Sequence, residues 1–527
     1  MVAALACSVA ADANRIAGVT GALHGIGMNR LLIALLPLLT TFADAADSGP
    51  KAGEPVSYWK HVRPILQAAC HGCHQPAKAR GGFVMTDFAA LLKGGEDDGA
   101  AVVSGNPAES SLLKNITPGS DGKAEMPKKA DPLKAGEIEL ISRWIAEGAK
   151  NDTPANAVQR FTPERHPVYV QPPVINSLAW SPDGSLLAVA GFHEVLLYKG
   201  GGTVLAGRLI GLSERVTTVR FSPDGKLLAA TGGLPGRMGE VQVWELASQK
   251  LRLSVPVTFD TVYGASWSPD SKLVAFGCAS DKSLRAIDTE TGTQVLFMAS
   301  HDDWVLDTTF STKGDHVMSV ARDMTAKLTE LATQRFVDNL TSITPGALKG
   351  GLTCIDRHPQ RDEILVGGAD GVPQIYRMVR LVQRRIGDNS NLIRKFPAME
   401  GRLWSVHYSP DGKRVLAASS LDGKGAVNIY NAEFDTGLPD EIKGIFGKSS
   451  TDRNAQQNAA VEKYQTDGAN LLHRIAVPTG IYTAQFSPDG KTIAAAGQDG
   501  LLRLINVEEG RIVKELLPVT LSPAGNP

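Results

Sequence analysis

The sequence has few cysteines: Cys7, Cys70, Cys73, Cys278 and Cys354 among 527 residues. Only Cys70 and Cys73 lie close together. A small extracellular domain stapled by disulfides carries an even number of cysteines at short, regular spacings. The scarcity excludes a disulfide scaffold, so the compartment in which the protein works has to be inferred from other features.

An excess of charge of one sign is also missing. The 54 Lys and Arg residues nearly balance the 55 Asp and Glu residues, and the formal net charge is -1. Proteins that bind nucleic acids or anionic lipid surfaces show an excess of basic residues. The composition therefore predicts no nucleic-acid partner.

Long apolar runs are absent as well. The most apolar run, residues 31–39, is shorter than the roughly 20 residues of a membrane-spanning helix. It follows Met28-Asn29-Arg30 and precedes the small-x-small segment at residues 43–45, an order typical of a cleaved secretory signal. We expect residues 1–45 to be an upstream extension and a signal peptide, with translation starting at Met28, rather than a retained anchor. The mature protein is then expected in the periplasm or the exported cell envelope, without a transmembrane span.

The character of the remaining sequence changes near residue 150. Residues 50–150 show helical periodicity and loops, whereas residues from 174 onward alternate short apolar segments with turn signals. Residues 151–173 between them are rich in proline, which disfavours helix and suits an extended connector. The sequence predicts a multidomain protein with a small all-α domain over residues 50–150, a linker over 151–173 and an all-β domain over 174–520.

The predicted all-β domain contains a repeat. An aromatic residue followed by Ser-Pro-Asp-Gly, or by a degenerate copy, occurs at residues 180–184, 221–225, 267–271, 310–314, 408–412 and 486–490, with a weaker copy at 354–361. Each copy predicts a strand, a tight turn and further strands. The copies recur roughly every 40 to 50 residues, which is the length of a four-stranded blade. The longer last interval predicts an insertion at about residues 433–473, which we expect to be a loop.

These repeats resemble the WD-repeat family over about 340 residues. The resemblance rests on the Ser-Pro-Asp-Gly turns and on Trp244, while the Gly-His that often opens a repeat is mostly absent, with Ser300-His301 the nearest trace. It implies a seven-bladed β-propeller over residues 174–520, one face of which binds a protein partner.

One motif carries chemistry, the segment Cys70-His71-Gly72-Cys73-His74. C-x-x-C-H is the attachment signature of haem c, because two thiols three residues apart can form thioethers with the haem vinyl groups while the histidine reaches the iron. A zinc site would need a second Cys or His pair nearby, and a thioredoxin-type redox pair would need a βαβ pattern; the sequence has neither. It therefore predicts one covalent haem c, held by Cys70, Cys73 and His74.

Helices are expected on both sides of this motif, because apolar residues recur at helical spacing. These residues are Val62, Ile65, Leu66 and Ala69 before the motif and Ile138, Ile141, Trp144 and Ile145 after it, with Gly148 as a helix stop. Two such helices can pack together and close a haem pocket.

The second axial ligand of the iron has to come from elsewhere. Met126 is the preferred candidate, because it lies on an irregular segment where a thioether can face the iron without a helix in the way. Met85 is the competitor, in a strand-like stretch where methionine more often fills a core. His61, His71 or an open coordination position are the remaining alternatives.

The region around the motif resembles the planctomycete-type cytochrome c domain over about 90 residues. The resemblance rests on the C-x-x-C-H motif and on residues 62–66, 81–82, 94–95, 107–113, 126–127 and 144–149. It implies a small cytochrome c-like fold with Met126 as distal ligand by its position. The sequence departs from the family at Lys128, which stands where a second proline is usual.

No catalytic constellation is visible in the repeats. Their histidines lack metal-type spacing and are expected to be structural; they are His193, His301, His358, His407 and His473. The aspartates that recur with the repeat are expected to form turns.

The preferred function is therefore an exported c-type cytochrome that transfers electrons with a redox protein partner and uses the propeller as a protein-interaction scaffold, rather than an enzyme. One alternative is an oxidoreductase with a second cofactor or substrate site in the propeller. The other is a haem-based redox sensor or structural envelope protein. Fold alone does not choose between these functions.

Overall fold

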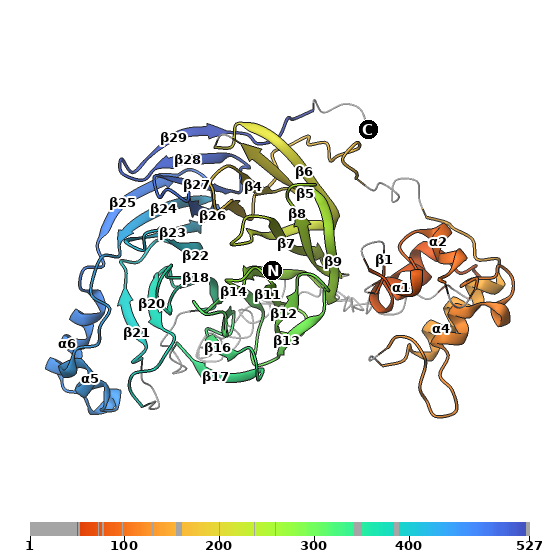
Figure 1. The fold of residues 1–527 in the computed structure, drawn as a ribbon, viewed down its shortest axis with the longest axis horizontal. Coiled ribbons are helices and arrows are strands. Elements are labelled where there is room, and N and C mark those ends of the chain that lie inside the picture. Colours follow the sequence, from red (N-terminus) through yellow and green to blue (C-terminus); the bar gives the residue numbers. More distant parts are fainter. Residues whose placement is uncertain are drawn as a thin grey trace, which may run out of the picture. The chain divides into compact units, whose positions relative to one another are not determined.

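The structure is a computed structural model that describes residues 50, 53–71, 73–75, 78–96, 99–128, 131–153, 161–199, 201–236, 238–258, 260–341, 350–383 and 389–522. The predicted signal peptide within residues 1–45, its start at Met28, and Cys7 lie outside the described residues. Within these ranges, no helix has both the length and the apolar character that a membrane span needs. We call residues 53–153 the helical region and residues 161–522 the sheet region, and Figure 1 labels many of the elements of both.

The helical region consists mainly of short helices joined by loops, which confirms the sequence prediction. Its elements are η1 (Tyr58–Val62), α1 (Arg63–Ala69), β1 (His74–Gln75), β2 (Lys78–Ala79), η2 (Arg80–Gly82), α2 (Phe88–Lys93), η3 (Pro107–Glu109), α3 (Ser111–Ile116) and α4 (Ala135–Ala146). The Ser57 side chain caps η1 by accepting a hydrogen bond from the Lys60 N–H, and Pro64 lies in the first turn of α1, where a missing N–H costs nothing.

The apolar faces predicted from residue spacing form the core of the helical region. Val62 at the end of η1 and Ile141 on α4 are fully buried. The ring of Tyr58 packs edge-on against Phe88 with centroids 4.8 Å apart, and lies 5.4 Å from the ring of Trp144. These contacts join η1, α2 and α4, and burying aromatic rings of this size supplies much of the stability of so small a region.

Helix α4 ends beside Gly148, as predicted. Gly148 adopts a φ of 100°, a left-handed conformation that glycine reaches without the strain of a Cβ atom. The following Ala149 N–H donates to the Trp144 carbonyl at 2.9 Å, which satisfies one of the free carbonyls of the last turn.

The sheet region is built from antiparallel sheets, which confirms the predicted all-β character. Among the described residues, five sheets have four strands each, and one has the seven strands β3 to β9. The strands are β3 (Leu178–Trp180), β4 (Leu187–Ala190), β5 (Phe192–Lys199), β6 (Val204–Phe221), β7 (Leu227–Leu234), β8 (Met238–Glu245), β9 (Lys250–Thr258), β10 (Val262–Trp267), β11 (Leu273–Cys278), β12 (Leu284–Asp288), β13 (Gln294–Met298), β14 (Val305–Phe310), β15 (His316–Ala321), β16 (Ala326–Glu330), β17 (Arg335–Asn339), β18 (Leu352–Arg357), β19 (Glu363–Gly368), β20 (Gln374–Arg377), β21 (Leu392–Lys395), β22 (Arg402–Tyr408), β23 (Arg414–Leu421), β24 (Lys424–Asn431), β25 (Leu471–Val477), β26 (Ile481–Phe486), β27 (Thr492–Gly497), β28 (Leu502–Asn506) and β29 (Arg511–Leu516). In Figure 1 the first strands of successive sheets, such as β14, β18 and β22, lie inside, and the last strands, such as β17, β21 and β25, lie outside.

Strand β6 is long enough to serve two sets of strands. Residues 204–210 pair with β5, and residues 215–221 pair with β7, with Arg215 also opposite Phe192 of β5. The seven-stranded sheet therefore divides into one set made of β3, β4, β5 and the first half of β6, and a second made of the other half of β6 with β7, β8 and β9. Every set in the sheet region then has four antiparallel strands.

The recurring Ser-Pro-Asp-Gly segment forms the turn between the first and second strands of a set. The Ser181 hydroxyl donates to the Asp183 carboxylate at 2.6 Å, the same carboxylate accepts the Ser185 N–H at 3.0 Å, and Gly184 adopts a φ of 71°. The hydrogen bond from Ser181 lowers the pKa of Asp183. Equivalent pairs recur at residues 222 and 224, 268 and 270, 409 and 411, and 487 and 489. The prediction that these aspartates form turns is confirmed.

The insertion near residues 433–473 differs from the loop that we expected. It contains the helices α5 (Asp440–Phe446) and α6 (Ala455–Thr466). The polar segment that suggests a loop is a helix start, since the Asn454 side chain accepts the Gln457 N–H at 2.8 Å and the Gln457 side chain accepts the Asn454 N–H at 3.2 Å. This capping box satisfies two backbone donors that would otherwise lack partners.

Two buried arginines of the sheet region hold this insertion. The Arg394 guanidinium donates to the carbonyls of Asp467 and Asp435, both at 2.8 Å, and lies 4.9 Å from the ring of Tyr464 on α6. Arg377 donates to the Tyr464 hydroxyl at 2.7 Å. Because β20 and β21 carry these arginines, the helices of the insertion are tied to that sheet by charge-assisted hydrogen bonds.

Candidate functional site

The C-x-x-C-H motif follows helix α1 directly. Cys70 is the residue at which α1 ends, and its N–H donates to the Leu66 carbonyl at 2.9 Å. The N–H groups of Cys73 and His74 both donate to the Cys70 carbonyl, at 3.1 Å and 3.2 Å. The backbone therefore turns tightly around Cys70, and both described thiols are free rather than joined in a disulfide.

A cavity of about 550 Å³ lies beside this turn. A cavity of this size is within the range that holds a cofactor. Its lining contains the four predicted site residues and Met85, and these are Cys70, Cys73, His74, Met85 and Met126. The structure therefore brings together two thiols, an imidazole and two thioethers from three segments of the chain. His61 and His71, which the sequence leaves open as ligands, do not line the cavity.

Close packing of glycines forms one wall of the cavity. Gly81 and Gly95 both line it, and a Cβ atom on Gly95 would lie 2.4 Å from the Gly81 carbonyl oxygen. The same carbonyl accepts the Glu96 N–H at 2.8 Å. The paired glycines of the sequence resemblance are thus explained by the close approach of two backbone segments, which only glycine permits.

The electrostatics of the cavity favour uncharged cysteine and histidine side chains. Burial raises the pKa of Cys70 to about 12, and the neighbouring Cys73 adds to this shift. Burial also lowers the pKa of His74. Hydrogen-bonding backbone groups of Phe83 and Arg80 act in the opposite direction, but their effect on the pKa is smaller. A redox-active cysteine pair requires a lowered thiol pKa, so Cys70 does not have the character of a thioredoxin-type nucleophile.

The residues present fit a haem of the c type. The His74 ring lines the cavity, and its buried Nδ1 atom makes no hydrogen bond of normal length and angle, although backbone groups of Phe83 and Arg80 lie near enough to raise the pKa of the ring. Two thiols and a thioether share the cavity with this ring, and they match the attachment and axial groups of haem c. The remaining lining includes apolar side chains such as Leu112 and Ile116, which suit the faces of a porphyrin.

Sequence reasoning missed several residues of this cavity. Arg80 and Lys128 place two cationic side chains on its lining, and Phe83 packs its ring 5.1 Å from that of His74. Lys128 is visible in the sequence only as a departure from the expected proline. Arg80 gives no signal of its own, since it lies in η2, whose position relative to the motif depends on the fold.

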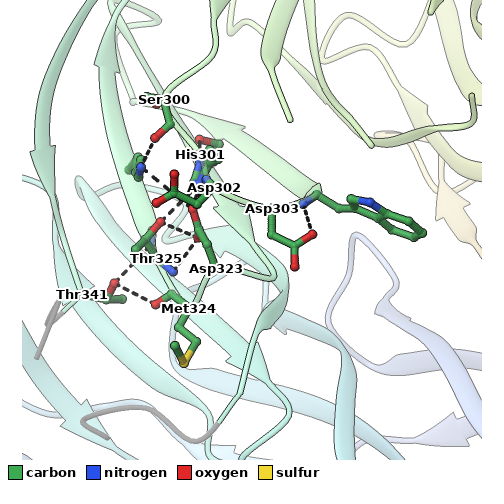
Figure 2. A network of polar contacts seen from close by, with 12 residues as sticks. Ser300, His301, Asp302, Asp303, Asp323, Met324, Thr325 and Thr341 are labelled. Atoms are coloured by element: carbon green, nitrogen blue, oxygen red, sulfur yellow. Dashed lines mark hydrogen bonds and ion pairs between the residues drawn. The ribbon is translucent and has the colours of Figure 1, made fainter. Parts of the chain in front are cut away.

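Two histidines of the sheet region, His301 and His358, have structural surroundings. His301 is buried, and its Nδ1 lies 2.9 Å from a carboxylate oxygen of Asp323, in the network of Figure 2. The buried His358 accepts backbone hydrogen bonds from Gln360 and Arg361 at 3.1 Å and 3.2 Å. Among the residues that the structure describes, no three His, Cys, Asp or Glu side chains come together as a metal-binding group.

Two family models match the chain. Residues 70–130 match the model of Planctomycete cytochrome C, and residues 164–193, 205–238, 390–425 and 470–506 match the model of the WD domain, G-beta repeat. The chain carries a planctomycete-type cytochrome c domain and WD repeats. The cytochrome c domain has a haem-related role, and the WD repeats form a protein-interaction scaffold.

Curated relatives with WD repeats in their names match part of the chain. WD repeat and SOCS box-containing protein 1 is 32% identical over 102 residues in Danio rerio and 30% identical over 102 residues in Homo sapiens. In each case the match covers 19% of this chain and 23% of the relative. WD repeat-containing protein SL1-17 of Schistosoma mansoni is 22% identical over 117 residues, which are 21% of this chain and 38% of that protein. The chain thus spans well under half the length of these relatives.

Proposed function

We propose that the protein is an exported c-type cytochrome that carries one covalent haem and transfers electrons, with the WD repeats as a scaffold for a protein partner. The observation that carries this proposal is the cavity of about 550 Å³ that gathers Cys70, Cys73, His74 and Met126. Export is inferred from the signal-like pattern of residues 28–45, and it agrees with haem c attachment outside the cytoplasm. We assign the haem domain to residues 50–150 and the linker to residues 151–173.

The cysteines and the histidine of the C-x-x-C-H motif would have separate roles in holding haem c. Cys70 and Cys73 would form the two thioethers, and His74 would supply the proximal nitrogen. Haem c supplies a one-electron couple at its iron. Leu112, Ile116 and other apolar side chains line part of the cavity and would limit water there, and a methionine sulfur ligand would raise the reduction potential.

The position of Met85 supports Met126 as the distal ligand. The Met85 N–H donates to the His74 carbonyl at 2.8 Å, so these two residues approach the cavity from neighbouring backbone. Met85 is also almost fully buried within the core of the domain. Met126 comes from a different segment, fixed by a hydrogen bond of 2.8 Å from its N–H to the Asn115 carbonyl. A haem in this cavity would take its second ligand from a segment separate from that of His74, and Met126 would supply it.

We further propose that the WD repeats form a closed, seven-bladed propeller over residues 174–520, with the insertion at 433–473 as an addition to one blade. The division of β6 gives seven four-stranded sets. A polar side chain on or just before the first strand of each set bonds to the first strand of the next set, and the last set bonds back to the first, which supports closure. The contacts are Ser177 with Val219, Thr217 with Val262, Ser266 with Thr308, Asp307 with Ile355, Thr353 with Leu403, Ser405 with Ala484, and Thr483 with Leu178.

The electron-transfer proposal is tested by a redox titration of the full chain, expressed from Met28 in a host that matures periplasmic cytochromes. We expect one iron per chain and a single reversible one-electron transition at a relatively high potential. A second redox centre would favour the oxidoreductase alternative instead. A haem that cannot be cycled between its two oxidation states would contradict electron transfer.

A further inference from the structure

A cavity of about 340 Å³ lies against the sheet formed by β22, β23, β24 and β25. Its lining comes from β23, β24, β25, the turn between β23 and β24, and residues 397–400, which precede β22. Ala426 on β24 lies opposite both Ser419 on β23 and Ala476 on β25, so these three lining residues share one face of the sheet. Their small side chains leave room beside that face, and the volume is in the range of small-molecule sites.

Asn428 is the buried amide of this cavity. It lines the cavity and is 5% exposed. Its Nδ2 donates to the Tyr430 hydroxyl at 2.9 Å, and that hydroxyl donates to the Pro397 carbonyl at 3.0 Å. Because a hydroxyl has a single hydrogen, Tyr430 has to accept from Asn428, and this fixes the amide nitrogen on the side of Tyr430. The amide oxygen is therefore left on the other side of the planar group.

This amide oxygen needs a donor. Within the part of the chain that the structure describes, Asn428 Oδ1 is buried and has no hydrogen-bond partner. A buried acceptor without a donor is costly, and native proteins rarely leave one. A water molecule could donate this bond, but one water takes only about 30 Å³, so most of the cavity would remain unexplained. A ligand that fills the cavity and donates to Oδ1 accounts for both features.

The charged side chains of the cavity balance one another. Arg474 lies 3.6 Å from the Glu400 carboxylate, and Asp422 and Lys424 stand on either side of the residue at the tip of the turn between β23 and β24. The lining thus contains two acidic and two basic side chains. A ligand with a net charge of either sign would meet as many like charges as opposite ones, so the cavity favours a neutral ligand.

Apolar side chains supply the remaining wall. Leu421 and Leu471 are 49% and 42% exposed, and both line the cavity together with the buried Met399. A purely apolar ligand would cover these leucines but would leave the Asn428 oxygen without a donor. A saccharide meets both demands, since its hydroxyls donate and accept hydrogen bonds while its ring presents C–H groups to an apolar surface.

We propose that this cavity binds a neutral saccharide, with a sugar hydroxyl donating to Asn428 Oδ1 and the C–H face of the ring against Leu421 and Leu471. A neighbouring hydroxyl donates to the Asp422 carboxylate, and another accepts from Lys424. This site goes beyond the proposed electron transfer and protein scaffold, because it gives the WD repeats a small-molecule ligand of their own, and it does not depend on haem.

The test is saturation-transfer NMR on the full chain. The neutral probes are glucose, galactose and mannose, the charged probes are glucuronate and glucosamine, and acetyl-alanine-methylamide represents a peptide group. We expect saturable transfer to at least one neutral hexose, stronger than to either charged sugar or to the amide. Asn428→Leu, which removes the acceptor at similar volume, should reduce that transfer at least fivefold. The exposed Asn458 on α6 supplies the matched control Asn458→Leu, which should bind normally.

A second variant keeps the proposal falsifiable if the loss of Asn428 disturbs folding. Ala426→Leu fills the cavity and leaves the bonds of Asn428 and Tyr430 in place, so it should also reduce transfer at least fivefold while the circular dichroism spectrum stays unchanged. Transfer to none of the three hexoses would overturn the inference. Stronger transfer to a charged sugar or to the amide, or undiminished transfer to the hexose in a folded Ala426→Leu variant, would overturn it as well.

Discussion

The imidazole of His301 and the carboxylate of Asp323 form a buried pair, with Nδ1 2.9 Å from Oδ2. The other ring nitrogen of His301 lies 2.8 Å from the Ser319 hydroxyl, and Asp323 also accepts the N–H groups of Asp302 and Thr325. The network joins the segment before β14 to the turn after β15 (Figure 2). This network explains why a trace of the Gly-His motif occurs at Ser300-His301, because His301 holds the start of β14 in place.

Substitution of His301 by Ala should destabilise the WD-repeat region. The change leaves the buried Asp323 carboxylate without its main partner, at a cost of about 2–4 kcal/mol in the free energy of unfolding. Urea unfolding followed by circular dichroism measures the effect. His316→Ala, which removes a partly exposed histidine beside Asp315, should change stability by less than about 0.5 kcal/mol, and equal losses in the two variants would refute the structural role of the network.

The same pair predicts a loss of stability in acid. Burial alone would raise the pKa of Asp323, but the interactions with His301, the Thr325 hydroxyl and the Asp302 N–H together outweigh it and hold the pKa below the usual range. A carboxylate with a depressed folded-state pKa stabilises the protein fully above its unfolded value of about 4 and loses that contribution as pH falls through the folded value. Urea midpoints between pH 2 and 7 should show this slope, and Asp323→Asn should reduce it.

Asp307 predicts the opposite slope at higher pH. Burial raises the pKa of Asp307 to about 6, although the nearby Arg220 and the hydrogen bond from the Ile355 N–H act to lower it. Because the folded state holds this proton more tightly than the unfolded state, stability should fall as pH rises from about 4 to about 6, by up to roughly 3 kcal/mol. Asp307→Asn should flatten that part of the stability profile. A profile identical to that of the unaltered protein would show that the carboxyl titrates normally.

Arg394 should anchor the helical insertion. Arg394→Ala removes the two hydrogen bonds to backbone carbonyls of the insertion and a stacking contact with Tyr464, so hydrogen exchange in α5 and α6 should accelerate at least tenfold. Arg394→Lys should not restore protection, since an ammonium group cannot reproduce the planar, divergent donors of a guanidinium. Arg474→Ala, at a half-exposed position on β25, is the control that should leave exchange unchanged.

The two methionines of the haem cavity should behave differently. Met126→Ala should abolish the weak red-edge absorption of a sulfur-ligated ferric haem and lower the reduction potential. Met85→Ala should retain that absorption and instead cost about 2–5 kcal/mol of stability, because Met85 is core. The reverse pattern would identify Met85 as the distal ligand.

Periodic patterns made much of the architecture readable from the sequence. The apolar spacing around Ile141 and Trp144 predicts α4, and the Ser181 to Gly184 turn predicts each tight connection between strands, because both depend on interactions within a few residues. The chemistry of Cys70, Cys73 and His74 is equally local.

Features that depend on contacts distant in sequence were not predictable. The helices of the insertion need Arg377 and Arg394 from β20 and β21, and the cationic lining at Arg80 needs η2 to fold back onto the motif. The sharing of β6 between two sets likewise appears only in the register of its pairing. The cavity of about 410 Å³ among the first strands of the sets is lined by residues from seven parts of the chain, and no single segment predicts it.

Covalent haem attachment is the claim on which the account depends most. The direct measurement is the mass of the denatured chain, together with its absorbance, for the unaltered protein, for Cys70→Ser with Cys73→Ser, and for the control Cys278→Ser in β11. We predict one haem per chain, retained after denaturation in the unaltered protein and in the control and absent from the double variant. Haem that stays bound to the denatured double variant, or a correctly matured unaltered chain without added mass, would contradict the account.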